Sequence, residues 1–487
     1  MSGDQPTTGR VAMRGGLSTT VARLAVVFIG LAGTAVLARL LTPADFGLVA
    51  KVTALTGIVN LLGEVGISIA VVQASELNGR QIAAFFWWNA LVSVGLGTIL
   101  ILVSPLIAAF YRDSRVVSIT MIIATAITIR GIGVVPMAVL RRNCQFTTMA
   151  AVQISAATVA VPTAIVLSQR VGFYSLAIQI AAMAMTTTIL AIACTGGLPK
   201  LLLRGTGIGD QFKLGLNFTA QGLINYFARN SDNILIGRYV GETALANYSK
   251  AYGLLMLPLS QIAGPLSQVA VPILSRLQDR PTEYRRQFLV GSSLSFLVQL
   301  PAAILVTCTA RPLVLTLLGG QWESAIPIFY ALAPAVVVST TAPGTYWIIP
   351  SLGLAKRQLP IVIVNTIVVV IAIAIGLQYG VLGVAVGFTL ASTLLRYPSL
   401  RYAMKPSSVA TGEFLMTGLT PLLASLASAI GMWALVWLWE PAMAPLALIY
   451  RIILFTAFYA ALVWPTTAGR RLVMLMKQHL LPFCTII

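Results

Sequence analysis

The stretch RLLTPADFGLVAK, residues 39–51, has a counterpart 199 positions later in RYVGETALANYSK, residues 238–250. In each run an arginine, apolar or aromatic residues and a polar turn lead to a lysine, and each run joins the first two apolar segments of its half of the chain. Two repeated halves around a shared substrate site are common in membrane transporters. The repeat therefore predicts two six-helix lobes related by a rough twofold axis along the membrane normal.

Long apolar segments surround this repeat on both sides. Of 487 residues, 58% are hydrophobic and 9% are charged, and about 20 apolar residues span a bilayer. The sequence predicts fourteen transmembrane helices near 18–41, 46–70, 82–110, 116–139, 147–169, 172–194, 213–237, 244–274, 287–309, 324–350, 358–378, 380–398, 413–438 and 442–464. The fold class is an all-α polytopic membrane protein, with two pseudo-symmetric lobes around a central cavity and two extra C-terminal helices.

Polar breaks divide the chain into five parts. They predict an N-lobe at 1–194, a cytoplasmic linker at 195–212, a C-lobe at 213–400, two further helices at 401–465 and an interfacial amphipathic helix at 466–487. One set of loops carries twenty Lys and Arg residues and the opposite set carries five. Because basic loops face the cytoplasm, we expect both termini there.

Several functional classes are disfavoured. The net charge of +19 is typical of basic cytoplasmic loops, so no nucleic-acid partner is expected. No Gly-rich phosphate loop ends in Gly-Lys-Ser/Thr, which argues against an ATPase. Four scattered cysteines and one histidine predict neither a metal site nor a cofactor. A membrane-embedded glycosyltransferase or polymerase would need catalytic acids or long loops, and these loops are short. We expect a transporter, not an enzyme.

Seven basic residues and two acidic residues lie inside the apolar segments. They are Arg23, Arg39, Lys51, Arg130, Arg229, Lys250 and Arg451, beside Glu64 and Asp232. A charge at bilayer depth costs roughly 3 kcal/mol and usually faces a bundle interior or a wet cavity. A net-positive interior predicts an anionic ligand. Arg451 falls outside the repeated twelve helices, so a structural or lipid-binding role suits it as well as a substrate role.

Two polar stripes accompany these charges. Asn217, Gln221, Asn225 and Arg229 recur every four residues and share one helix face. They predict a cavity lining; the alternative is hydrogen bonding between helices, with Arg229 and Asp232 as an ion pair. The second stripe contains Thr53, Thr56, Asn60, Glu64 and Ser68. Glu64 would bind a coupling ion or pair with an arginine of another helix, and both readings stay open.

Six runs resemble a known group: LARLLTPADFGLVA (37–50), LRRNCQF (140–146), DNILIGRYVG (232–241), ANYSKAYGLLMLPL (246–259), PILSRLQD (272–279) and LLGGQW (317–322). They resemble the Wzx-like polysaccharide-biosynthesis flippases of the multidrug/oligosaccharidyl-lipid/polysaccharide exporter superfamily, near the colanic-acid and succinoglycan type. The resemblance implies a V-shaped cavity in a bacterial inner-membrane protein. The implied cargo is an undecaprenyl-pyrophosphate-linked oligosaccharide, which moves from the cytoplasmic to the periplasmic leaflet for exopolysaccharide or O-antigen synthesis.

The resemblance and the charge pattern together give the candidate site residues. The cations Arg130, Arg229, Lys250, Arg39 and Lys51 would meet the pyrophosphate, and Asn217, Gln221, Asn225 and Asn60 would meet sugars, with Glu64 and Asp232 as ion-coupling or ion-pairing groups. Membrane lipids and polysaccharide polymerase or export machinery are further expected partners of a monomer. The alternative is an ion-coupled multidrug antiporter of the same fold, which would favour an acidic, aromatic cavity.

Overall fold

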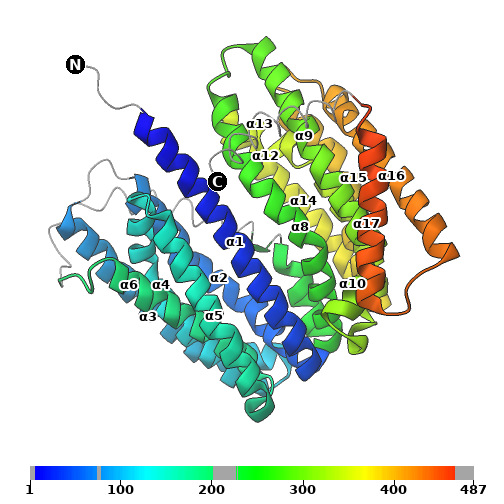
Figure 1. Ribbon diagram of the computed structural model, residues 1–487. Helices are drawn as coiled ribbons and strands as arrows, with labels where there is room; N and C mark the ends of the chain where they lie inside the picture. The colour runs from blue at the N-terminus through cyan, green and yellow to red at the C-terminus, as the bar shows by residue number, and fades with distance from the viewer. Residues whose placement is uncertain (1–5, 74–77, 201–225, 228, 467–487) are drawn as a thin grey trace, which may run out of the picture. The chain divides into compact units, whose positions relative to one another are not determined.

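The computed structural model describes residues 6–73, 78–200, 226–227 and 229–466. Every regular element in these ranges is a helix, which confirms the all-α class (Figure 1). The first helices are α1 (Pro6–Leu40), α2 (Pro43–Gln73), α3 (Gly79–Tyr111), α4 (Arg115–Arg142), α5 (Phe146–Val171) and α6 (Tyr174–Cys194). The later long helices are α8 (Glu242–Ser275), α9 (Pro281–Cys308), α11 (Ala325–Ser339), α14 (Ala355–Gly376), α15 (Gly380–Met404), α16 (Thr411–Leu438) and α17 (Ala444–Val463).

The helices are long and apolar enough for a multi-pass membrane protein. Among the described residues, ten stretches could cross a membrane, and a bent helix pair would make eleven. One of the ten, Ala355–Met404, holds both α14 and α15, which pack against each other. The predicted seventh span lies partly at 201–225, outside the described residues. The count of fourteen therefore stays a prediction.

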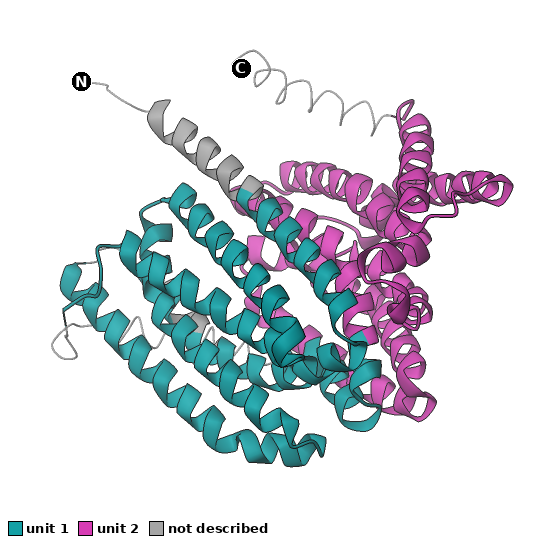
Figure 2. Ribbon diagram, turned by 60° about the horizontal axis from the view of Figure 1, so that its bottom comes forward, with its two compact units in different colours: residues 1–246 teal, residues 247–487 magenta. Residues whose placement is uncertain are grey.

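The chain forms two compact units, residues 1–246 and 247–487 (Figure 2). In the first unit, α1 packs on α5, α5 on α6, and α6 on α4, which also contacts α2 and α3. This unit reaches past the predicted linker at 195–212 and includes the start of α8. The predicted lobe boundaries and their twofold relation remain predictions, and most of the predicted interfacial helix at 466–487 lies outside the described residues.

Small residues allow α4 to approach its neighbours closely. A Cβ at Gly131 would collide with Ser93 of α3, and a Cβ at Gly133 would collide with Thr188 of α6. Glycine at such contacts brings helix backbones together in membranes, where packing and interhelical hydrogen bonds replace the hydrophobic effect as the driving force. Helix α4 is therefore held between α3 and α6, with its other side toward α2.

The second unit shows one departure from the predicted spans. The stretch expected as a single helix at 324–350 divides into α11, α12 (Pro343–Tyr346) and α13 (Ile348–Ser351), with a bend of 42°. Proline removes an amide donor and clashes with the preceding turn, and Pro343 stands at this break. Arg396 lies inside α15 and donates a hydrogen bond to Thr341 beside the bend. A short helix, α10 (Ala310–Leu317), follows α9 and was not predicted.

Candidate functional site

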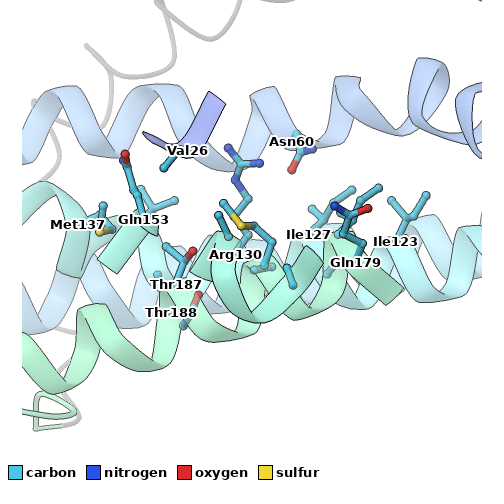
Figure 3. Close-up of a pocket in the computed structure, with 18 of the residues that line it drawn as sticks. Val26, Asn60, Ile123, Ile127, Arg130, Met137, Gln153, Gln179, Thr187 and Thr188 are labelled. Carbon is cyan, nitrogen blue, oxygen red and sulfur yellow. The ribbon is translucent and has the colours of Figure 1, made fainter. Parts of the chain in front are cut away.

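A pocket of about 940 Å³ lies inside the first unit, among α1, α2, α4, α5 and α6. Its polar lining consists of Arg130 and Arg141 from α4, Thr53, Thr56, Asn60 and Ser68 from α2, Gln153 from α5, and Gln179, Thr187 and Thr188 from α6. None of the described residues that line the pocket is acidic. In Figure 3 the Arg130 side chain extends across the pocket toward the helix that carries Asn60. The pocket thus offers guanidinium, amide and hydroxyl groups.

The backbone on both sides of Arg130 is fixed by hydrogen bonds. Asn89 Nδ2 donates to the carbonyl of Gly131 at 2.6 Å, and Thr188 Oγ1 donates to the carbonyl of Ile129 at 2.9 Å. These bonds come from α3 and α6, the helices that pack on either side of α4. Buried side-chain hydrogen bonds of this kind hold a functional residue in place. Arg130 therefore projects into the pocket from a rigid part of the helix.

The stripe predicted on α2 faces this pocket. Thr53, Thr56, Asn60 and Ser68 all line it. Residue 64 falls between Asn60 and Ser68 at spacings of four, which places it on the same helix face. The side chain of Glu64 lies outside the described part of the structure, so its ion-coupling or pairing role remains a hypothesis.

Sequence reasoning missed several lining residues. Gln153, Gln179 and Thr187 are single polar residues in apolar spans, and nothing in their spacing singled them out. Arg141 lies beyond the predicted span 116–139, but it belongs to the last turn of α4. One signal was available for it, because positions 130 and 141 are three helical turns apart and share a face.

Four other predicted residues are described by the structure and do not belong to the pocket lining. Arg39 is exposed in the last turn of α1, Arg229 is exposed in the helical stretch 229–239, and Lys250 is half-buried on α8. Asp232 is buried, and its carboxylate accepts a hydrogen bond from the Asn233 amide at 2.8 Å. Asn217, Gln221 and Asn225 lie outside the described residues. The substrate roles of all these residues stay predictions.

Lys51 belongs to a four-residue ionic network at one end of α2. Its Nζ lies 3.1 Å from Glu242 Oε2 at the start of α8 and 3.8 Å from Asp113 Oδ2 between α3 and α4. Arg115 Nη2 lies 2.8 Å from Asp113 and 3.0 Å from Glu242. The hydrogen bond from Arg115 holds the pKa of Asp113 below its usual range. With two cations and two carboxylates, the network is neutral, and Lys51 is engaged by acids that sequence analysis had not paired with it.

The backbones around this network are in close contact. A Cβ on Gly47 would collide with the carbonyl of Glu242. The Tyr226 hydroxyl donates to the carbonyl of Ala54 at 2.9 Å. The network and the Tyr226 hydrogen bond join α2 to residues that follow the linker. Their partners on α2, Lys51 and Ala54, lie within one turn of Thr53, the first residue of α2 that lines the pocket.

Arg451 has a structural environment in the second unit. Its Nε and Nη2 donate to both oxygens of Glu440, at 2.7 and 3.0 Å, and its Nη1 donates to the Cys308 carbonyl at 2.8 Å. The guanidinium also lies over the Trp433 ring, 4.5 Å from its centroid. These contacts tie α17 to α9 and α16. Of the roles considered for Arg451, the structural one explains this geometry.

Comparison with known proteins places the chain in a family. The family described as "Polysaccharide biosynthesis protein" matches residues 36–327, and the chain belongs to it. The chain is 25% identical over 343 residues to the teichuronic acid biosynthesis protein TuaB of Bacillus subtilis, covering 67% of this chain and 68% of that protein. It is 21% identical over 393 residues to the lipopolysaccharide biosynthesis protein WzxC of Escherichia coli, covering 78% of each.

Solved structures share the fold. The lipid II flippase MurJ in an inward closed conformation superposes with a TM-score of 0.73 at 13% identity, covering 92% of this chain and 98% of that one. An inward-facing multidrug transporter of the MATE family superposes with a TM-score of 0.64 at 15% identity, covering 80% of this chain and 98% of that one. The chain therefore shares the fold of these two proteins.

Proposed function

We propose that this protein is a flippase that moves undecaprenyl-pyrophosphate-linked oligosaccharide repeat units from the cytoplasmic to the periplasmic leaflet of the bacterial inner membrane, for exopolysaccharide or O-antigen synthesis. The observation that carries the proposal is the pocket around Arg130. It combines guanidinium groups with amides and hydroxyls inside a membrane-spanning helical unit. Membership in the polysaccharide-biosynthesis family and the fold shared with a lipid II flippase support it.

The chemistry of the pocket suits each polar part of such a cargo. A guanidinium offers a planar set of donors that matches phosphate oxygens. Gln153, Gln179 and Asn60 can both donate to and accept from sugar hydroxyls. The prenyl chain needs no polar partner and can stay in lipid. A volume of about 940 Å³ is near the upper end of ordinary ligand pockets, which is large enough for a diphosphate with its first sugars.

The proposed energy source is inferred from the missing ATPase phosphate loop and from the acidic residue Glu64. The chain has no Gly-Lys-Ser/Thr phosphate loop, so in this proposal transport is driven by an ion gradient or by consumption of the cargo on the far side. Glu64 of α2, four positions from both Asn60 and Ser68, is the candidate coupling group. The proposed role is transport of a lipid-linked sugar, without a bond made or broken by the protein.

A purified-protein flipping assay tests the proposal. Liposomes containing the protein and a fluorescent undecaprenyl-pyrophosphate oligosaccharide are treated with a membrane-impermeant quencher, which reports movement between leaflets. We expect flipping with the wild-type protein and an initial rate about tenfold to a hundredfold lower with Arg130→Gln, because a hydrogen bond to a charged group contributes about 1.5–3 kcal/mol. Arg170→Gln is the matched control, since Arg170 is exposed at the end of α5, outside the pocket lining.

The same assay separates the alternative function. A multidrug antiporter would move a cationic dye, and its binding would need carboxylates. The described pocket lining contains arginines and no acid, so we expect no dye transport above that of empty liposomes. Dye transport without flipping of the lipid-linked sugar would replace the proposal with the antiporter.

A further inference from the structure

The pocket contains a second arginine that no predicted role accounts for. Arg141 lines the same pocket as Arg130 and lies on the same helix, α4. The two are eleven positions apart, which corresponds to about 16 Å of helix rise and just over three turns. Both side chains therefore leave α4 on the pocket side, at two different depths.

The neighbouring arginine shows that this placement is selective. Arg142 Nη1 donates to the carbonyls of Val71 and Val72 at 3.1 and 3.3 Å, where α2 ends. It satisfies carbonyls that the end of α2 leaves without intrahelical donors. Arg141, one position earlier, is exposed and lines the pocket. Of this adjacent pair, one arginine joins helices and the other is presented to a ligand.

The two ends of the pocket differ in how they are occupied. At the end where α2 and α4 begin, Lys51, Arg115, Asp113 and Glu242 form a network of matched charges. At the end where α2 and α4 finish, Arg142 contacts α2 and Arg141 faces the pocket. The basic-loop pattern assigns this second end to the cytoplasm. A cargo from the cytoplasmic leaflet would reach Arg141 before Arg130.

We propose that Arg141 is a second anion-binding station of this pocket, which takes the phosphate head of the cargo at the mouth before Arg130 takes it at depth. The proposal rests on the proposed flippase function for the identity of the cargo. Arg130 extends across the pocket toward α2 (Figure 3), so each arginine serves a separate position. Arg141 stands in the last turn of α4, where the negative end of the helix dipole weakens binding of an anion. The mouth station is therefore the weaker of the two, and the anion moves toward tighter binding.

Binding of inorganic pyrophosphate to the purified protein tests the number of stations. At about 16 Å, two bound anions are about two Debye lengths apart at physiological salt, so they bind almost independently. We expect two equivalents for the wild type, with the weaker one lost in Arg141→Gln and the tighter one lost in Arg130→Gln. Arg141→Lys should keep two equivalents with several-fold weaker binding at the mouth. Arg170→Gln should behave as wild type. Because Arg141 is exposed, its variants should elute and unfold as the wild type does.

The flipping assay gives an independent readout. Arg141→Gln should raise several-fold the cargo concentration needed for half-maximal flipping and leave the maximal rate near that of the wild type. A wild-type stoichiometry of zero or one, or Arg141→Gln indistinguishable from Arg170→Gln in both assays, would overturn the mouth station. Two pyrophosphate equivalents without any flipping of the lipid-linked sugar would instead contradict the proposed function and leave the two-station pocket in place.

Discussion

Lys51 Nζ lies 3.1 Å from Glu242 Oε2, although 191 residues separate them in the chain. The lysine side chain is 7% exposed and the glutamate is 22% exposed, so the pair is largely withdrawn from solvent. This contact connects α2 with the start of α8 and neutralises a cation that the sequence suggested for cargo. Its energetics can be measured apart from transport.

Removal of one member of this pair should destabilise the protein. Lys51→Met or Glu242→Gln should each cost up to about 3 kcal/mol, because breaking a buried ion pair leaves one charge without its main partner. The double variant should be more stable than the sum of the single losses predicts. Thermal unfolding in one detergent would give the coupling, and additive losses would mean that the pair contributes no interaction of its own.

Asp113 should make stability depend on pH in the acid range. The hydrogen bond from Arg115 lowers the folded-state pKa of this carboxyl. Its stabilisation is therefore fully present above the unfolded-state pKa of about 3.9 and is lost as pH falls through the lower folded-state pKa. We expect the difference in unfolding temperature between wild type and Asp113→Asn to shrink below about pH 4. A constant difference from pH 7 to pH 3 would contradict this assignment.

Gly47 should not tolerate a methyl group. Its position against the Glu242 carbonyl leaves no space for a Cβ, whereas an added Cβ at Gly95 of α3 meets nothing within 4 Å. Both substitutions to alanine gain roughly 1 kcal/mol of helix propensity. Gly47→Ala should nevertheless lower the unfolding temperature, and Gly95→Ala should raise or preserve it. Equal effects of the two variants would show that α2 and α8 are not in close contact here.

Arg451 should act through hydrogen-bond geometry. Arg451→Lys keeps the charge but loses the paired contacts to Glu440 and the bond to the Cys308 carbonyl, which should cost about 2 kcal/mol. Arg311→Lys is the control, because its ion pair with Glu323 is exposed and such pairs contribute about 0–1 kcal/mol. If the Arg451→Lys protein is as stable as the wild type but impaired in flipping, the result would support a substrate role for Arg451 instead.

The elements that could be predicted from the sequence are those that depend on hydropathy and residue spacing within a single segment. Apolar segments of membrane length predict α3 to α6 within a few residues, since lipid requires every backbone donor and acceptor to be satisfied inside the helix. The spacing of Thr53, Thr56, Asn60 and Ser68 likewise predicts that they share one face, and all four line the pocket.

The parts that sequence reasoning missed depend on contacts between distant segments. Nothing near Lys51 reveals that Glu242 approaches it, and an isolated glutamine such as Gln153 has no period to mark its face. Arg141 and Arg142 are chemically identical neighbours, and only the position of α2 separates their roles. Pro343 and Gly344 stand just after Ser339 at the bend, whose angle of 42° cannot be read from the residue types.

The position of Glu242 late in the first unit also determines when the ionic network around Lys51 can form during translation. A ribosome adding about 5–20 residues per second needs roughly 10 to 40 seconds to proceed from Lys51 to Glu242, 191 residues later. Helices α2 to α6 are completed during that interval, while Lys51 has Asp113 of the network's two carboxylates but not yet Glu242. The charge balance of this network is therefore completed only near the end of the first unit, and a chain released at residue 200 would lack one of its two carboxylates.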